Sequence, residues 1–231
     1  MESLQTILTK YDAIVFFDTE TTGLDANKHQ IIELAAARVE SWHNGTPFVT
    51  DQMDLFIKLP DGQTLPEEIV NLTGITDAML AENGVSADEA AAQIANMMRG
   101  SVLMCAHNAQ FDAGFLRNLM KGRTVNVVHW LDTLTVFKDR RAYPHKLANA
   151  ISAYGLEDRV QNSHRAIDDV LALMEVTAAM AEERNDLDKY VNLFGYNPKY
   201  GVSGLKIKGV RYLPQRFWDF MTTVGTALYS Y

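Results

Sequence analysis

A short apolar run that ends in two acids is the strongest constraint in this sequence. Residues Ile14 to Phe17 are all β-branched or aromatic, which predicts a strand buried on both faces of a sheet. Side chains two apart in a strand point the same way, so Asp18 and Glu20 should share one face. Two carboxylates there repel each other and are costly to desolvate unless a cation lies between them. Because hard divalent cations prefer oxygen ligands, this segment predicts a metal-dependent enzyme.

The composition is that of an ordinary soluble protein and sets few other limits. The chain has 231 residues, of which 47% are hydrophobic and 22% charged, enough for one domain with an appendage. No apolar run approaches the roughly 20 residues that span a bilayer, and Met1 to Gln5 lack the pattern of a signal peptide. We therefore expect a cytoplasmic protein with no membrane partner. The single cysteine, Cys105, lies in an apolar run and is predicted to be a core residue.

Charge is unevenly distributed along the chain. The net charge of −8 argues against a broad nucleic-acid-binding surface, although metal ions held by acids could bridge to a phosphate locally. Between Lys189 and Trp218 there are six Lys or Arg residues, no Asp or Glu, and several aromatic residues. We therefore divide the chain into a core, residues 1–185, and a small C-terminal appendage, residues 186–231. The appendage could bind single-stranded nucleic acid, pack as a hairpin on the core, or dock a partner protein.

Turn signals and periodicity predict a mixed sheet. Asn44-Gly45 indicates a hairpin, Ser86 with Glu89 predicts a capping box, and strands alternate with helices further along the chain. This order is typical of an α/β fold whose mixed five-stranded sheet is flanked by helices. The expected strands are residues 14–17, 31–40, 48–59, 102–106 and 127–131, and the expected helices are residues 67–71, 86–99, 108–121, 145–154 and 165–183.

Two further aspartates lie near the starts of predicted helices. Asp112 is explained as well by a favourable interaction with the helix dipole as by a function. In the later helix, Asp168 lies on the polar stripe, whereas Asp169 shares a stripe with apolar residues. A carboxylate covered by protein needs a partner, so Asp169 is the candidate metal ligand. His164 is expected on the loop before this helix, where it can lean toward the same site.

Four short segments occur in one order along the core. They are Phe17 to Leu24, Leu72 to Thr76, His107 to Asp112, and the pair His164 and Asp169 with four residues between them. Together they resemble the exonuclease motifs of the DEDDh (DnaQ-like) 3′–5′ exonucleases, over about 170 of the 231 residues. That family includes the proofreading subunit or domain of bacterial DNA polymerase III and also RNA-trimming enzymes.

The resemblance implies a ribonuclease H-like fold and a two-metal mechanism. Asp18, Glu20, Asp112 and Asp169 would bind two Mg²⁺ or Mn²⁺ ions. His164 would be the general base, because an ordinary imidazole titrates near about pH 6.5 and can accept a proton from water. The expected reaction releases nucleoside 5′-monophosphates from the 3′ end of DNA, as in proofreading or repair.

The resemblance also implies which residues bind the 3′-terminal nucleotide. These are Thr21, Thr22 and Gly23 at the sugar, Glu68 and Thr73 in the pocket, and Leu72 or Phe111 against the base. The expected partners are single-stranded or frayed 3′ ends of DNA and, as a candidate protein partner, a DNA polymerase. An RNA-directed 3′–5′ exoribonuclease is the alternative, since the same acids would serve either sugar. A catalytically inactive scaffold is disfavoured, because all four acids and the histidine are present.

Overall fold

The acidic strand predicted near the start of the chain lies at the centre of the main sheet. The computed structural model describes residues 2–123, 128–160, 162–202 and 206–215. Its five-stranded sheet has the order β3-β2-β1-β4-β5, with β1 antiparallel to β2 and parallel to β4. The strands are β1 (Ala13–Thr21), β2 (Ile31–His43), β3 (Thr46–Phe56), β4 (Val102–Ala106) and β5 (His129–Asp132). The predicted mixed five-stranded sheet of an α/β fold is thereby confirmed.

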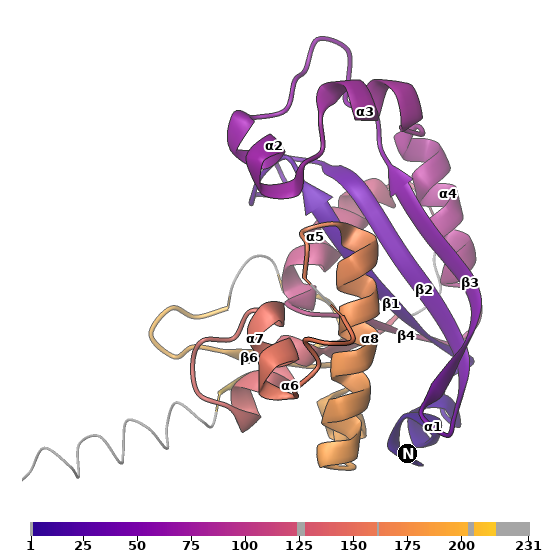
Figure 1. The fold of residues 1–231 in the computed structure, drawn as a ribbon, viewed down its shortest axis with the longest axis vertical. Coiled ribbons are helices and arrows are strands. Elements are labelled where there is room, and N and C mark those ends of the chain that lie inside the picture. The colour runs from indigo at the N-terminus through magenta and orange to yellow at the C-terminus, as the bar shows by residue number, and fades with distance from the viewer. Residues whose placement is uncertain (1, 124–127, 161, 203–205, 216–231) are drawn as a thin grey trace, which may run out of the picture.

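Helices cover both faces of this sheet (Figure 1). The described helices are α1 (Glu2–Leu8), α2 (Glu67–Thr73), α3 (Asp77–Asn83), α4 (Ala87–Met97), α5 (Ala109–Leu119), α6 (Thr133–Arg140), α7 (Leu147–Ala153) and α8 (Ala166–Glu183), with a 3₁₀ turn η1 (Leu187–Tyr190). The Ser86 hydroxyl accepts a hydrogen bond from the Glu89 N–H at the start of α4, which is one half of the predicted capping box. Three of the helices, α1, α3 and α6, were not predicted from the sequence.

β1 is buried on both faces, as its apolar run predicted. Phe16 belongs to a core shared with α1, α6, α7 and α8, whereas Phe17 belongs to a second core shared with α4 and α5. Side chains alternate along a strand, so Asp18 and Glu20 continue the side of Phe16, against which α8 packs. Cys105 is buried in the same core, as expected.

The C-terminal appendage packs on the core through a second, two-stranded sheet. Its strands, β6 (Leu193–Tyr196) and β7 (Arg211–Pro214), are parallel, so the expected hairpin is wrong. Phe194 is only 2% exposed within the core of α4 and α5, and the Tyr212 hydroxyl donates a hydrogen bond to Gln110 Oε1 at 2.7 Å. Packing on the core is therefore observed, while the boundary at residue 186 stays a prediction. Residues 216–231 lie outside the described part of the chain.

A helix that crosses a bilayer must be both long and apolar. None of the helices in the described ranges meets both requirements.

Candidate active site

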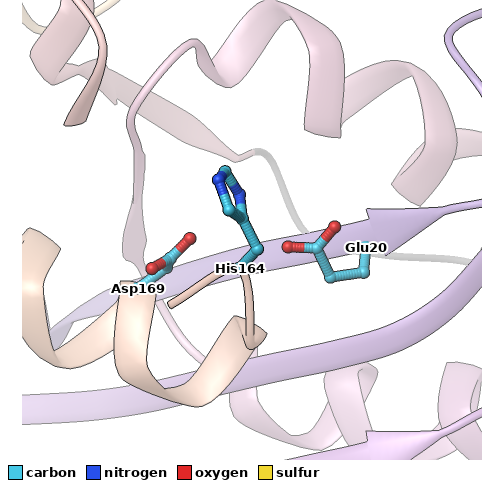
Figure 2. Close-up of side chains that lie close together, drawn as sticks. All are labelled: Glu20, His164 and Asp169. Atoms are coloured by element: carbon cyan, nitrogen blue, oxygen red, sulfur yellow. The ribbon is translucent and has the colours of Figure 1, made fainter. Parts of the chain in front are cut away.

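Three elements carry the predicted acids to one end of the sheet, where Glu20, Asp169 and His164 come close enough to share one ion and Asp18 and Asp112 lie near enough to interact electrostatically with them. Asp18 and Glu20 lie near the carboxyl end of β1, and Asp112 and Asp169 lie in the first turns of α5 and α8. Figure 2 shows the Glu20 and Asp169 carboxylates turned toward each other with the His164 imidazole beside them. One ligand atom from each of these three residues lies within 4.8 Å of the other two.

Asp112 is held against β1 by a hydrogen bond between buried side chains. The Thr19 hydroxyl donates to Asp112 Oδ1 at 2.7 Å, and Asp112 is only 3% exposed. The start of α5 is set by Asp132, whose Oδ1 accepts the N–H groups of Asn108 at 2.9 Å and Ala109 at 3.1 Å. A carboxylate at a helix start satisfies N–H groups that lack helical partners. Asp132 therefore fixes the helix that carries Asp112.

The start of α8 is held by an acid on the neighbouring strand. Glu33 of β2 is fully buried, and its Oε1 accepts hydrogen bonds from Arg165 Nε at 2.9 Å and Nη2 at 2.7 Å. Its other oxygen accepts the Ala166 N–H at 3.0 Å. Glu33 is also the β2 partner of Glu20 in the sheet register. We call this contact of Glu33 with Arg165 and Ala166 the latch. It places Asp169, one turn into α8, beside the carboxylates of β1.

The structure separates the two adjacent aspartates as the helical stripes predicted. Asp169 is 6% exposed, and its Oδ1 is buried and accepts no hydrogen bond from any described residue. Asp168 instead accepts a hydrogen bond from the exposed Ser163 hydroxyl. His164 is exposed on the loop before α8 in a left-handed conformation, with φ of 58°, which few non-glycine residues adopt.

Burial raises the pKa of every acid in the cluster, and repulsion by the other cluster acids adds to this at Asp18 and Glu20. Burial raises the pKa of Glu20 to about 8, aided by the nearby charges of Asp169, Glu33 and Asp112. Burial raises the pKa of Asp112 to about 7 against the opposing Thr19 hydrogen bond, and that of Asp169 to about 6. The pKa of Asp18 is well above its ordinary value, because it is buried among the other carboxylates.

These residues fit divalent cations. Carboxylate oxygens are the donors that Mg²⁺ and Mn²⁺ prefer. Asp169 lies close to Glu20 and His164, and its Oδ1 has no hydrogen-bond partner among the described residues. A buried charged oxygen without a partner is costly. A bound cation would supply the missing partner and lower the pKa of each acid around it.

The turn predicted to bind the terminal sugar is held by its own hydrogen bonds. The Thr21 hydroxyl donates to the carbonyl of Gly23 at 2.8 Å, and the Thr22 hydroxyl accepts from the Gln30 N–H at 3.2 Å. A Cβ on Gly23 would lie 2.6 Å from the ring of His29, so a larger residue there would require that ring to move. The turn directly follows the acids of β1, as the predicted role requires.

The other predicted substrate residues lie on α2 and α5, outside the acid cluster. Glu68 and Leu72 are exposed on α2, Leu72 at 53%. Thr73 is buried, and its hydroxyl donates to the Ile69 carbonyl and accepts the Ile75 N–H, which ends the helix. The substrate roles of these residues remain predictions.

Phe111 lies in the first turn of α5, next to a groove. Its ring packs against Phe115 with the centroids 4.9 Å apart. Both rings line a groove of about 440 Å³ that also includes Leu24 and Asn108. A base could reach the exposed edge of this groove, so the predicted role of Phe111 stays open.

Two residues that organise the site, Glu33 and Asp132, were missed from the sequence. Glu33 interrupts the apolar segment at residues 31–37 of a predicted strand, and a lone acid there signals a buried partner. Asp132 follows a predicted strand without a turn signal, so nothing local marks it as the cap of two helices.

The sheet and its covering helices have the ribonuclease H-like fold that exonuclease I shares, with a TM-score of 0.67. Residues 15–177 match the family model RNase_T, described as exonuclease. The chain therefore belongs to this exonuclease family, and the expected likeness to the DnaQ-like exonucleases is confirmed.

Similar proteins fall into two groups. DNA polymerase III PolC-type of Staphylococcus aureus (strain USA300) is 33% identical over 189 residues, which cover 79% of this chain but only 12% of the polymerase. The zinc-bound complex of Escherichia coli exonuclease I with single-stranded DNA superposes with a TM-score of 0.66 at 20% identity, over 78% of this chain and 42% of that one. Exonuclease X in complex with 5′ overhanging duplex DNA gives 0.54 at 20% identity, over 74% and 92%. The structural likenesses show a shared fold.

We expect the metal-free protein to lose stability as the pH rises from about 4 to about 8. Raised pKa values mean that the folded state keeps protons that the unfolded chain, with carboxyl pKa values of about 4, has already lost. The stabilisation is complete below about pH 4, and its loss ends as the pH passes about 6 for Asp169, about 7 for Asp112 and about 8 for Glu20. Thermal unfolding in EDTA measures this, and Mn²⁺ should raise the melting temperature most at high pH.

Asp169→Asn is the control for this pH dependence. The amide removes one charge from the cluster, so both the pH slope in EDTA and the Mn²⁺-dependent shift should shrink. The same Mn²⁺ shift in the variant and the wild type would contradict a metal site at Asp169.

Glu33→Gln should lower kcat by about 10- to 100-fold with little change in KM. Losing the charge weakens the latch on Arg165 and Ala166, so His164 and Asp169 are held less firmly, and small misplacements of reacting groups are costly. The Mn²⁺-dependent melting shift should persist, because Glu33 is not among the proposed ligands. Glu175→Gln is the matched control, since Glu175 lies on α8 and pairs with the exposed Arg159 at 2.7 Å. Equal kcat values for the two variants would show that the latch does not position the site.

Proposed function

We propose that this chain is a metal-dependent 3′–5′ exonuclease of the DEDDh type that removes nucleoside 5′-monophosphates from the 3′ ends of DNA. One observation carries the proposal. Asp169, whose buried Oδ1 accepts no hydrogen bond from the described residues, lies beside Glu20 of a separate element and the exposed His164. That combination suits the hydrolysis of a phosphodiester at cations better than it suits any structural role.

Each residue of the cluster has a distinct task in this proposal. Asp18, Glu20, Asp112 and Asp169 would hold two Mg²⁺ or Mn²⁺ ions. When bound, such ions supply Lewis-acid stabilisation of the charge at phosphorus and lower the pKa of a bound water. His164, exposed at the rim of the cluster, accepts the proton of the attacking water as general base. The new O–P bond replaces the bond to O3′, and the departing oxygen takes a proton from solvent.

The relatives support DNA as the substrate. Structures that share this fold hold single-stranded DNA or 5′ overhanging duplex DNA, and the similar curated sequences are DNA polymerases. The match covers 12% of those polymerases, so a DNA polymerase as a partner of this chain remains a prediction. The turn at Thr21 to Gly23 and the exposed side chains of α2 are suited to recognise a strand terminus, which favours exonucleolytic over internal cleavage.

The test is digestion of matched single-stranded DNA and RNA, each labelled at either its 5′ or its 3′ end. With Mg²⁺, 5′-labelled DNA should give a ladder that shortens by single nucleotides, while the 3′ label is released at once as a mononucleotide. Asp169→Asn should abolish the ladder, and His164→Gln should lower kcat by about 10²- to 10⁴-fold. Asp168→Asn is the matched control, because Asp168 lies outside the cluster, and it should retain activity.

Three outcomes would contradict parts of the proposal. Immediate release of the 5′ label as a mononucleotide would show that digestion starts at the 5′ end. Faster loss of RNA than of DNA would leave the mechanism unchanged but would show that RNA is the preferred substrate. An active Asp169→Asn variant, or digestion unaffected by EDTA, would show that the acid cluster takes no part in the reaction.

A further inference from the structure

A second pocket lies between the core and the C-terminal appendage, beyond the acid cluster. It has a volume of about 170 Å³, and its walls include Asn108, Gln110, Lys138, Tyr196, Tyr200 and Tyr212. The first three belong to α5, its N-cap and α6, and the tyrosines belong to the appendage. The pocket therefore exists only because the appendage packs on the core.

The pocket adjoins the proposed active site. Asn108 and Gln110 also line the groove that contains Phe111, so the two hollows meet over the start of α5. Asp112 lies in the same first turn of this helix. A strand whose end reaches the acids could therefore place a base in the pocket.

Hydrogen bonds fix the appendage relative to the acids. The Gly195 N–H donates to Thr135 Oγ1 at 2.9 Å, and that hydroxyl donates to Asp132 Oδ2 at 2.6 Å. Asp132 in turn caps α5, as described above, and the Tyr212 hydroxyl donates to Gln110 at 2.7 Å. The pocket is therefore formed before a ligand arrives, which lowers the entropic cost of binding.

Aromatic rings and cations meet at the pocket. Tyr200 is 75% exposed, and Lys199 Nζ lies 5.2 Å from the centroid of its ring. Lys206 Nζ lies 5.8 Å from the ring of Tyr212. Residues 189–215 contain five Lys or Arg and no Asp or Glu, in a chain whose net charge is −8. Rings that stack on bases, with cations that contact phosphates, are the means by which proteins bind single strands.

The volume limits what the pocket can hold. Pockets for drug-sized ligands measure about 300–1,000 Å³, so 170 Å³ suits a single planar base rather than a whole nucleotide. The amide of Asn108 adds a polar group that can face the edge of a base.

We propose that this pocket binds an unpaired base of the nucleic-acid strand that the active site shortens. The substrate class rests on the proposed function, whereas the binding itself does not require catalysis. The appendage thus adds a stacking and cationic contact that lies outside the matched family region, residues 15–177, and offsets the acidic charge of the core.

The experiment is fluorescence anisotropy of 5′-labelled 12-nucleotide single-stranded DNA with the full chain in EDTA. Single abasic sites are placed at successive positions from the 3′ end. The wild type should lose affinity at one or two internal positions, by about 5- to 100-fold, the range expected for one stacked base. Tyr200→Ala should bind the unmodified strand more weakly by a similar factor and should show no loss at those positions.

Phe48→Ala is the matched control. Phe48 is also an exposed aromatic residue, at 61%, but it lies at the opposite end of the sheet, paired with Ser41. It should retain wild-type affinity and the wild-type abasic profile. The effect of Tyr200→Ala should also disappear when the DNA is too short to reach from the acids to the pocket.

The outcomes separate this proposal from the proposed function. A flat abasic profile in the wild type, or equal affinities for Tyr200→Ala and Phe48→Ala, would overturn the pocket even if the enzyme digests DNA. A position-specific loss that Tyr200→Ala removes would support the pocket even if no digestion occurs. Equal thermal unfolding of the variants excludes misfolding as the cause of a difference.

Discussion

Repulsion among buried carboxylates at the end of β1 is the constraint on which the rest of this site depends. Four acids lie in surroundings that raise the pKa of each of them, to about 8 for Glu20. A fold keeps such a group of acids only if strong contacts elsewhere hold their elements in place. The crowding of carboxylates that destabilises the metal-free protein is therefore the same feature that suits the cluster to bind cations.

Three hydrogen-bonded contacts hold the acids against this repulsion. Thr19 ties Asp112 to the central strand, Glu33 holds the start of α8, and Asp132 caps α5 and α6. Each contact joins the element of one acid to a neighbouring element. The Asp132 contact extends through Thr135 to β6, so the appendage is part of the same scaffold. The catalytic centre and the pocket proposed for an unpaired base therefore share their supports.

Local patterns in the sequence predicted the strands and the acids but not the contacts that position them. The buried run before Asp18 and the apolar stripe that contains Asp169 were sufficient to mark both residues as candidate metal ligands, because burying a charge without a partner is costly. The seven-residue helices α1 and α3 are too short to show clear periodicity, and the β-branched residues at the start of α6 weaken its helical signal. The parallel pairing of β6 with β7, and the partners of Glu33 and Asp132, join residues distant in sequence. No local pattern carries that information.

The central claim is that the four carboxylates exist to hold divalent cations. The most direct measurement is anomalous diffraction from crystals grown with Mn²⁺, which locates the ions without reference to activity. The account predicts two peaks among Asp18, Glu20, Asp112 and Asp169, one of them in contact with Asp169 Oδ1, the buried oxygen that has no described partner. Well-ordered density for these four side chains at neutral pH, with no anomalous peak between them, would contradict the account.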